Sequence, residues 1–173
     1  MNTPLRHCPR CGAASFATVD GRLYRCDRCE FNFYHNNAAA VTAVIRHGTR
    51  IAWTLRGREP GRGMLDLPGG FVDPGESLET AMLREIEEEL GVSLRAPRYL
   101  FSLPNEYPYR DVLYQTTDAF FEFELDAPFA ANLDHDEVLR LEWLQLEEVD
   151  VERIAFVAVR NAVQLLRGLV PGA

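Results

Sequence analysis

The four cysteines of this chain constrain its fold most strongly, because they form two Cys-x-x-Cys pairs near the N-terminus: Cys8 with Cys11, and Cys26 with Cys29. Each pair can present both sulfurs from one tight turn, and four thiolates around Zn²⁺ stabilise a segment too short to build a core. Asp20-Gly21, between the pairs, is a candidate hairpin turn. The spacing predicts a small zinc ribbon over residues 1–36; a disulfide or redox pair, or another metal such as iron, is the alternative.

The composition is that of a globular protein. Of 173 residues, 47% are hydrophobic and 25% are charged, which is enough for one main domain with its own core. The formal net charge of −8 argues against a protein whose main task is to grip a nucleic-acid backbone, although divalent cations can still hold small phosphorylated substrates. The sequence contains neither a signal-peptide core nor a stretch of about 20 apolar residues. We therefore expect a cytoplasmic protein without a membrane partner.

Residues 37–173 are expected to form the main domain. Apolar runs at 38–47 and 51–55 flank a glycine turn and predict two strands. Further strands are expected at 98–102, 113–125 and 138–146, and a last helix at 151–169. Strands on both sides of one helix, followed by a second helix, predict an α/β fold with a mixed sheet between helices.

One predicted helix carries the candidate site. Apolar residues recur every four positions over residues 77–90, and Gly91 can end the helix in the left-handed conformation. Glu85, Glu88 and Glu89 share one face of this helix, without Lys or Arg at the spacings that would pair with them. Mg²⁺ or Mn²⁺ would relieve the repulsion, because hard cations prefer carboxylate oxygen; a solvated acidic face is the alternative.

Around this helix the chain resembles the Nudix hydrolases. Their signature is matched at every defined position by Gly70, Glu76, Arg84-Glu85-Ile86, Glu88-Glu89 and Gly91-Val92. The resemblance implies an α/β/α sandwich with a mixed sheet, preceded here by the ribbon. It also implies a metal-dependent hydrolase whose substrate is a nucleoside diphosphate linked to another moiety.

The same resemblance implies roles for individual residues. The metal ligands that it implies are the Gly69 carbonyl and the carboxylates of Glu85, Glu88 and Glu89. Arg84 orients these carboxylates, and either Glu88 or Glu85 takes the proton of the attacking water. The residues with structural roles are Gly70, Glu76, which braces the loop through Arg84, and Gly91.

A zinc ribbon before a Nudix domain is similar to the NADH pyrophosphatases and to relatives that cleave FAD or other dinucleotides. There, an acidic stretch before a Trp supplies another metal ligand, which implies this role for Glu137; a solvated carboxylate at a strand start is the alternative. Phe71 matches a position whose ring stacks on a base, and a core role is equally compatible. Tyr107 and Tyr109 are candidates for ring stacking or for loop packing.

The segment after the Nudix motif differs from that of the NADH pyrophosphatases. It reads Ser102-Leu103-Pro104-Asn105 where they have a Ser-Gln-Pro-Trp segment, and Pro108 is similar to a marker of ADP-ribose pyrophosphatases. We therefore expect a pyrophosphohydrolase that cleaves dinucleotide-like substrates of the NADH, FAD or ADP-ribose class to two monophosphates. Relatives are often homodimers, so the resemblance also implies a dimer.

Two other functions remain open. The first is a regulatory protein that senses a nucleotide and uses its ribbon to bind nucleic acid. The complete set of carboxylates and the net charge of −8 argue against it. The second is a Nudix enzyme that acts on nucleoside triphosphates or on capped RNA.

Overall fold

The computed structural model describes residues 5–169, so the outer ends of the two expected domains, residues 1–4 and 170–173, lie outside the described part. The chain forms two compact units. The chain up to Asn37 forms one together with Arg110–Val112, and Ala38–Tyr109 forms the other together with the chain from Leu113 onward. Within the described residues, no helix is both long and apolar enough to cross a membrane.

The N-terminal unit contains a three-stranded antiparallel sheet. Its strands, in spatial order, are β1 (Phe16–Thr18), β2 (Leu23–Cys26) and β3 (Asn32–Tyr34). Asp20 holds the first turn, because its Oδ1 accepts hydrogen bonds from the N–H groups of Arg22 at 2.9 Å and Leu23 at 2.7 Å. The expected hairpin is therefore confirmed. The small core of the N-terminal unit consists of the buried residues Cys8, Phe16, Tyr24 and Cys26.

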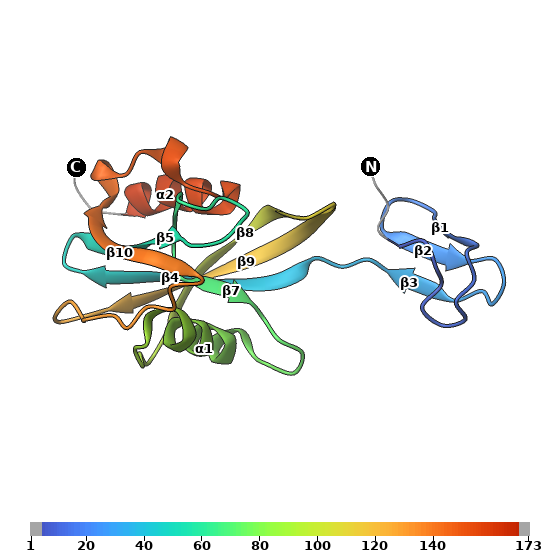
Figure 1. Ribbon diagram of the computed structural model, residues 1–173, viewed down its shortest axis with the longest axis horizontal. Helices are drawn as coiled ribbons and strands as arrows, with labels where there is room; N and C mark the ends of the chain where they lie inside the picture. Colours follow the sequence, from blue (N-terminus) through green and yellow to red (C-terminus); the bar gives the residue numbers. More distant parts are fainter. Residues whose placement is uncertain (1–4, 170–173) are drawn as a thin grey trace. The chain divides into compact units, whose positions relative to one another are not determined.

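The second unit is built on one mixed sheet with the order β10-β5-β4-β9-β8 (Figure 1). β4 runs parallel to β9, and β5 lies antiparallel to both of its neighbours, which confirms the mixed sheet. Two short strands pair with β5 and β4. The strands are β4 (Ala38–His47), β5 (Arg50–Arg56), β6 (Leu65–Asp66), β7 (Gly69–Phe71), β8 (Arg98–Tyr109), β9 (Val112–Glu124) and β10 (Val138–Gln145).

Two helices cover opposite faces of this sheet (Figure 1). They are α1 (Leu78–Leu90) and α2 (Val157–Leu169). Strand residues alternate between the two cores because successive side chains point to opposite faces: on β9, Phe120 packs on the α2 side and Phe121 on the α1 side. The expected α/β/α sandwich is confirmed.

Both ends of α1 have capping interactions. At the start, the Ser77 hydroxyl accepts a hydrogen bond from the N–H of Thr80 at 3.1 Å. At the end, Gly91 has a φ of 64°, and its N–H donates to the Glu87 carbonyl. A Cβ atom on Gly91 would also lie 2.7 Å from the Asn132 carbonyl oxygen. The predicted helix end is therefore confirmed, and glycine is required there for both conformation and packing.

The expected start of the last helix at residue 151 is wrong. The structure has a 3₁₀ turn at Val151–Arg153, and Ile154 then forms a parallel bridge with Leu65 before α2 begins at Val157. The side chain of Arg160 donates two hydrogen bonds to the Ile154 carbonyl, at 2.9 and 2.7 Å. The apolar periodicity was misleading because Ile154 is buried beside Leu65, with which it forms an isolated bridge, and not on the face of a helix.

The strand expected at residues 98–102 extends to Tyr109. Tyr107 and Tyr109 therefore lie on β8 and not in a loop. Two prolines within this strand concealed it, because proline cannot donate to a sheet and occurs mainly on edge strands. β8 is the edge strand of the main path of the sheet, which explains the exception.

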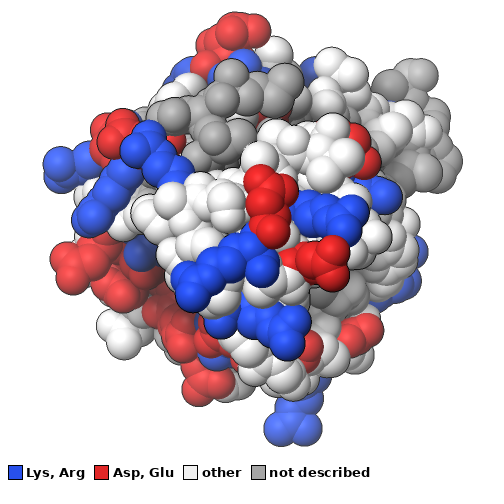
Figure 2. Space-filling view, turned by 90° about the vertical axis from the view of Figure 1, so that its right-hand side faces the viewer, with Lys and Arg blue, Asp and Glu red and all other residues white. Residues whose placement is uncertain are grey.

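Charged side chains of both signs are mixed on part of the surface. On the face shown in Figure 2, arginine side chains lie among aspartate and glutamate side chains.

Candidate active site

The site begins at β7, where close packing requires two glycines. Gly69 has a φ of 148°, and a Cβ atom there would lie 2.1 Å from the carbonyl oxygen of Val41 on β4. A Cβ atom on Gly70 would lie 2.6 Å from the carboxyl group of Glu85 on α1. The two glycines thus allow β7 to pair closely with β4 while a carboxylate of α1 approaches its backbone.

Arg84 connects the loop before α1 to the carboxylates on the helix. Its Nε and Nη2 donate to the two carboxylate oxygens of Glu76, each at 2.9 Å. Its Nη1 donates to Glu85 and Glu88, again at 2.9 Å, and Nη2 also reaches the Phe71 carbonyl at 3.1 Å. One guanidinium therefore positions three carboxylates and the end of β7.

This arrangement corrects one expectation from the sequence. Glu88 was expected to have no basic partner on its helix, but Arg84 lies four residues earlier and pairs with it. The sequence does place Arg84 four residues before Glu88, a spacing at which a helix brings two side chains together. A planar guanidinium has five N–H donors, so it can bind several carboxylates at once.

The inner carboxylates lie where negative charge is unfavourable. Burial is the main cause of the raised pKa of Glu85; Arg84 opposes it, and the charges of Glu88 and Glu137 add to it. Burial also raises the pKa of Glu89 well above its usual value, although the Gly69 N–H donates to Glu89 at 3.1 Å. A cation or a proton at this position would relieve the repulsion.

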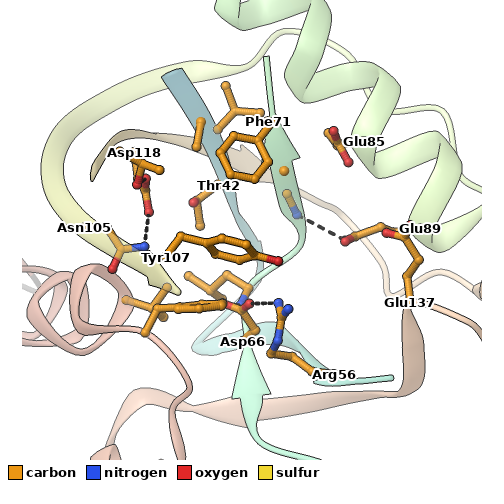
Figure 3. Close-up of a pocket in the computed structure, with 18 of the residues that line it drawn as sticks. Thr42, Arg56, Asp66, Phe71, Glu85, Glu89, Asn105, Tyr107, Asp118 and Glu137 are labelled. Carbon is orange, nitrogen blue, oxygen red and sulfur yellow. Dashed lines mark hydrogen bonds and ion pairs between the residues drawn. The ribbon is translucent and has the colours of Figure 1, made fainter. Parts of the chain in front are cut away.

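Most of the predicted site residues line one cavity of about 260 Å³. They are Gly69, Gly70, Phe71, Arg84, Glu85, Glu88, Glu89, Tyr107 and Glu137. Figure 3 shows Glu85, Glu89 and Glu137 on one side of the Tyr107 ring. Glu76 does not line this cavity but pairs with Arg84, which does. Gly91 ends α1 two residues after Glu89 and does not line the cavity.

Aromatic rings form the wall of the cavity. The Tyr107 ring centroid lies 5.3 Å from that of Phe71 and 5.5 Å from that of Phe156. Tyr109 does not line this cavity; it lines a second one of about 450 Å³, together with Tyr114. The two cavities share Arg58, Phe71 and Tyr107, so they adjoin. Ligand clefts usually measure about 300–1,000 Å³, and the two together reach that range.

Sequence analysis missed eight polar residues that line the first cavity: Thr42, Arg56, Arg58, Asp66, Asp73, Asn105, Thr116 and Asp118. Arg56 pairs with Asp66 at 2.7 Å, and its guanidinium lies 4.6 Å from the centroid of the Phe156 ring. Two of these residues could have been identified from the sequence, because an acidic residue within an apolar strand is rarely buried unless it is paired or hydrogen-bonded. Asp66 lies between two leucines, and Asp118 directly precedes an apolar run.

The four cysteines form a second candidate site in the N-terminal unit. Their sulfur atoms all lie within 4.8 Å of one another, and among the described residues they are the one group of at least three such ligand atoms. All four are free, and the Cys8–Cys29 and Cys11–Cys26 sulfur distances are both 3.7 Å. Four sulfurs at 2.3 Å from a tetrahedral Zn²⁺ would be about 3.8 Å apart, so the cluster fits a metal ion of this kind.

Comparison with known proteins identifies the class that this fold and this site define. The NUDIX domain family matches residues 35–164, and the chain belongs to this family. The resemblance noted in the sequence is therefore confirmed.

Two relatives illustrate the similarity, both of them NAD-capped RNA hydrolases called NudC. The chain is 33% identical to that of Deinococcus radiodurans over 114 residues, which cover 64% of this chain and 41% of the relative. It is 30% identical to that of Yersinia enterocolitica over 146 residues, which cover 83% of this chain and 52% of the relative. The chain thus spans about half the length of these relatives or less.

Solved structures agree with this fold. The MutT NUDIX hydrolase from Burkholderia pseudomallei superimposes with a TM-score of 0.64 at 26% identity, covering 75% of this chain and 98% of that one. A NUDIX hydrolase from Nitrosomonas europaea gives 0.66 at 20% identity, covering 97% and 96%. Because the sequence identity is only 20%, the similarity to the Nitrosomonas europaea structure concerns the fold alone.

Proposed function

We propose that this protein is a metal-dependent pyrophosphohydrolase that cleaves the diphosphate bond of dinucleotide-like substrates to two monophosphates. The observation that carries the proposal is the convergence of Glu85, Glu88, Glu89 and Glu137 on one cavity with an aromatic wall. NADH and FAD combine a diphosphate with an aromatic ring system on each side, and ADP-ribose has a base on one side and a ribose on the other. Two adjoining cavities that share Phe71 and Tyr107 suit such a substrate.

The residues present fit Mg²⁺ or Mn²⁺. The proposed ligands are the Gly69 carbonyl and the carboxylates of Glu85, Glu88, Glu89 and Glu137, all of them oxygen donors. The raised pKa values of Glu85 and Glu89 support this choice, since an adjacent cation stabilises buried carboxylates. When bound, such ions lower the pKa of water and neutralise charge on the phosphates.

The protein side chains orient the groups and accept the proton. We propose Arg84 as the residue that holds Glu85 and Glu88 in place. Of the two candidate bases, Glu88 is the better placed, because its side chain is 59% exposed whereas that of Glu85 is 11% exposed. An exposed carboxylate can pass the proton on to solvent. Phe71, Tyr107 and Tyr109 are proposed to bind the rings of the substrate.

The N-terminal unit is proposed to be a zinc ribbon comprising residues 1–36, followed by the hydrolase domain at 37–173. Its four cysteines are the proposed Zn²⁺ ligands, since a tetrathiolate is the usual donor set of a structural zinc site. A cytoplasmic location fits this assignment, because thiols stay reduced there. We also propose that the protein forms a homodimer.

The test is an activity screen with Mg²⁺ or Mn²⁺ on NADH, FAD and ADP-ribose. Glu88→Gln is expected to lower turnover by orders of magnitude while the far-UV circular dichroism is unchanged. Glu87→Gln is the matched control, because Glu87 lies on the same helix, is exposed and does not line the cavity. Equal rates for both variants, or no cleavage by the wild type of any diphosphate, would reject the proposal.

Capped RNA is a second candidate substrate. It is favoured by the relatives, which are NAD-capped RNA hydrolases. The test compares release of the cap from NAD-capped RNA with cleavage of free NADH at equal concentrations. A much higher kcat/KM for the capped RNA would make RNA the principal substrate, whereas the reverse would support small molecules.

A further inference from the structure

A buried carboxylate at the opposite end of the cavity has no part in the proposed metal site. Asp118 lies on β9, is 6% exposed and lines the cavity. In Figure 3, Asp118 and Asn105 lie on the other side of Tyr107 from Glu85 and Glu89. The cavity therefore has two acidic ends with an aromatic ring between them.

Neighbouring side chains hold the Asp118 carboxylate in place. Asn105 Nδ2 donates to Asp118 Oδ2 at 3.0 Å, and the Thr116 hydroxyl donates to Oδ1 at 2.5 Å. Asn105 is itself held, because its Oδ1 accepts a hydrogen bond of 3.4 Å from the N–H of Ala158 at the start of α2. Three elements, β8, β9 and α2, thus fix the orientation of one carboxylate.

These bonds do not use the full accepting capacity of the carboxylate. An ionised carboxylate has about four acceptor positions, and the side chains of Asn105 and Thr116 occupy one on each oxygen. Asp118 lines the cavity, so a ligand that enters can reach the remaining positions. A buried carboxylate discriminates strongly between ligands, because a ligand without a donor leaves its lone pairs unpaired.

A ligand group that complements Asp118 carries hydrogen-bond donors, and donors on the edge of a flat ring also suit the aromatic side chains that line the cavity. The ring can lie against Phe71 and Tyr107, whose centroids are 5.3 Å apart in an edge-to-face pair, while its edge faces Asp118. The phosphates of the same molecule would then extend toward Glu85 and Glu89, on the other side of Tyr107 (Figure 3).

We propose that Asp118 determines substrate specificity by accepting a hydrogen bond from an exocyclic amino group on the substrate ring. This inference rests on the proposed function, since it concerns the substrate of the same site. Among the proposed substrates, two rings carry such an NH2 group: adenine carries it as an amino group, and nicotinamide carries it as part of its carboxamide. Rings that present a carbonyl or a carboxylate at that position are rejected, because oxygen would face oxygen.

The test measures binding of mononucleotides to the full chain by isothermal titration calorimetry in Mg²⁺. AMP is compared with IMP, which has a carbonyl in place of the amino group. Nicotinamide mononucleotide is compared with nicotinic acid mononucleotide, which has a carboxylate in place of the carboxamide. The wild type is expected to prefer the amino member of at least one pair by about tenfold, the effect of one hydrogen bond to a charged group.

The decisive variant transposes the two polar residues. In Asn105→Asp/Asp118→Asn, the new amide can donate to the new carboxylate, and Thr116 can still donate to residue 118, so the network is preserved while the accepting group is moved. The preference is expected to fall to about twofold or less. Asp118→Asn alone is the second variant. Glu124→Gln is the matched control, because Glu124 is an exposed acid on the same strand that does not line the cavity.

Each outcome has a defined meaning. Loss of the AMP preference supports an aminopurine, and loss of the nicotinamide preference supports a ring carboxamide. A wild type with no preference in either pair, or a preference that both variants retain, overturns the proposal. Binding does not require hydrolysis, so a protein that discriminates AMP from IMP but cleaves no diphosphate would refute the proposed function and not this inference.

Discussion

Arg84 binds Glu76 through two parallel hydrogen bonds, from Nε to Oε1 and from Nη2 to Oε2, both 2.9 Å long. Glu76 in turn accepts a hydrogen bond from the N–H of Asp73 at 3.1 Å. The loop before α1 is therefore tied to the middle of the helix by one ion pair, and the same guanidinium reaches Glu85 and Glu88. The positions of these carboxylates therefore depend on the planar, forked arrangement of the N–H donors in the Arg84 guanidinium.

Arg84→Lys is expected to lower kcat by about 100-fold, because an ammonium group cannot reproduce the fork and small displacements of catalytic groups have effects of this size. Steady-state kinetics at saturating Mg²⁺ measures the effect. Arg95→Lys is the control, since Arg95 is exposed just beyond the helix. Wild-type turnover in Arg84→Lys would show that the fork is dispensable.

Gly69→Ala is expected to lower the free energy of unfolding by about 2 kcal/mol or more. The added Cβ would lie 2.1 Å from the Val41 carbonyl oxygen, so β7 must move away from β4. Urea denaturation measures the loss. Gly168→Ala is the control: it lies in α2 with open space around it, and alanine there should raise stability by about 0.5–1 kcal/mol. Equal effects of the two substitutions would contradict the packing argument.

Asp66→Asn is expected to change how stability depends on pH. Burial raises the pKa of Asp66 to about 6, against the opposing effect of Arg56. The folded state therefore holds a proton that the unfolded state releases near pH 3.8, and stability from this group is lost as the pH rises toward 6. From pH 4.5 to 7, the wild type should lose about 2 kcal/mol relative to Asp66→Asn.

Urea unfolding at the two pH values tests this difference. Asp126→Asn serves as the control, because it is the same substitution at an exposed position. A constant stability difference between wild type and Asp66→Asn over this range would mean that Asp66 titrates as an ordinary aspartate.

Cys11→Ser is expected to remove bound zinc and to lower the melting temperature of the N-terminal unit. The core of this unit is small, so metal ligation should supply much of its stability. Zinc content by mass spectrometry and a thermal scan measure the two effects. If the ribbon is structural, turnover at saturating Mg²⁺ should not change. The metal site would be excluded if the wild type contained no zinc and melted at the same temperature as Cys11→Ser.

The local features could be predicted from the sequence. The apolar stripe of α1, its end at Gly91 and the hairpin turn at Asp20 all depend on residues within a few positions of one another. The last helix and β8 were predicted with wrong ends, because Ile154 pairs with the distant Leu65 and because β8 is an edge strand that tolerates proline. Local periodicity contains no information about such pairing.

By itself, the sequence determined the two cysteine pairs, the acidic helix face and the glycine turn, and with them the family, since spacing along the chain alone defines these motifs. Only the tertiary structure decided what surrounds them. The parallel pairing of β4 with β9 sets Asp118 beside Ala40, and folding of β8 and α2 brings Asn105 to it. These residues meet because a sheet joins segments that are far apart in the chain. A pattern of neighbouring residues does not specify which distant segments will pair.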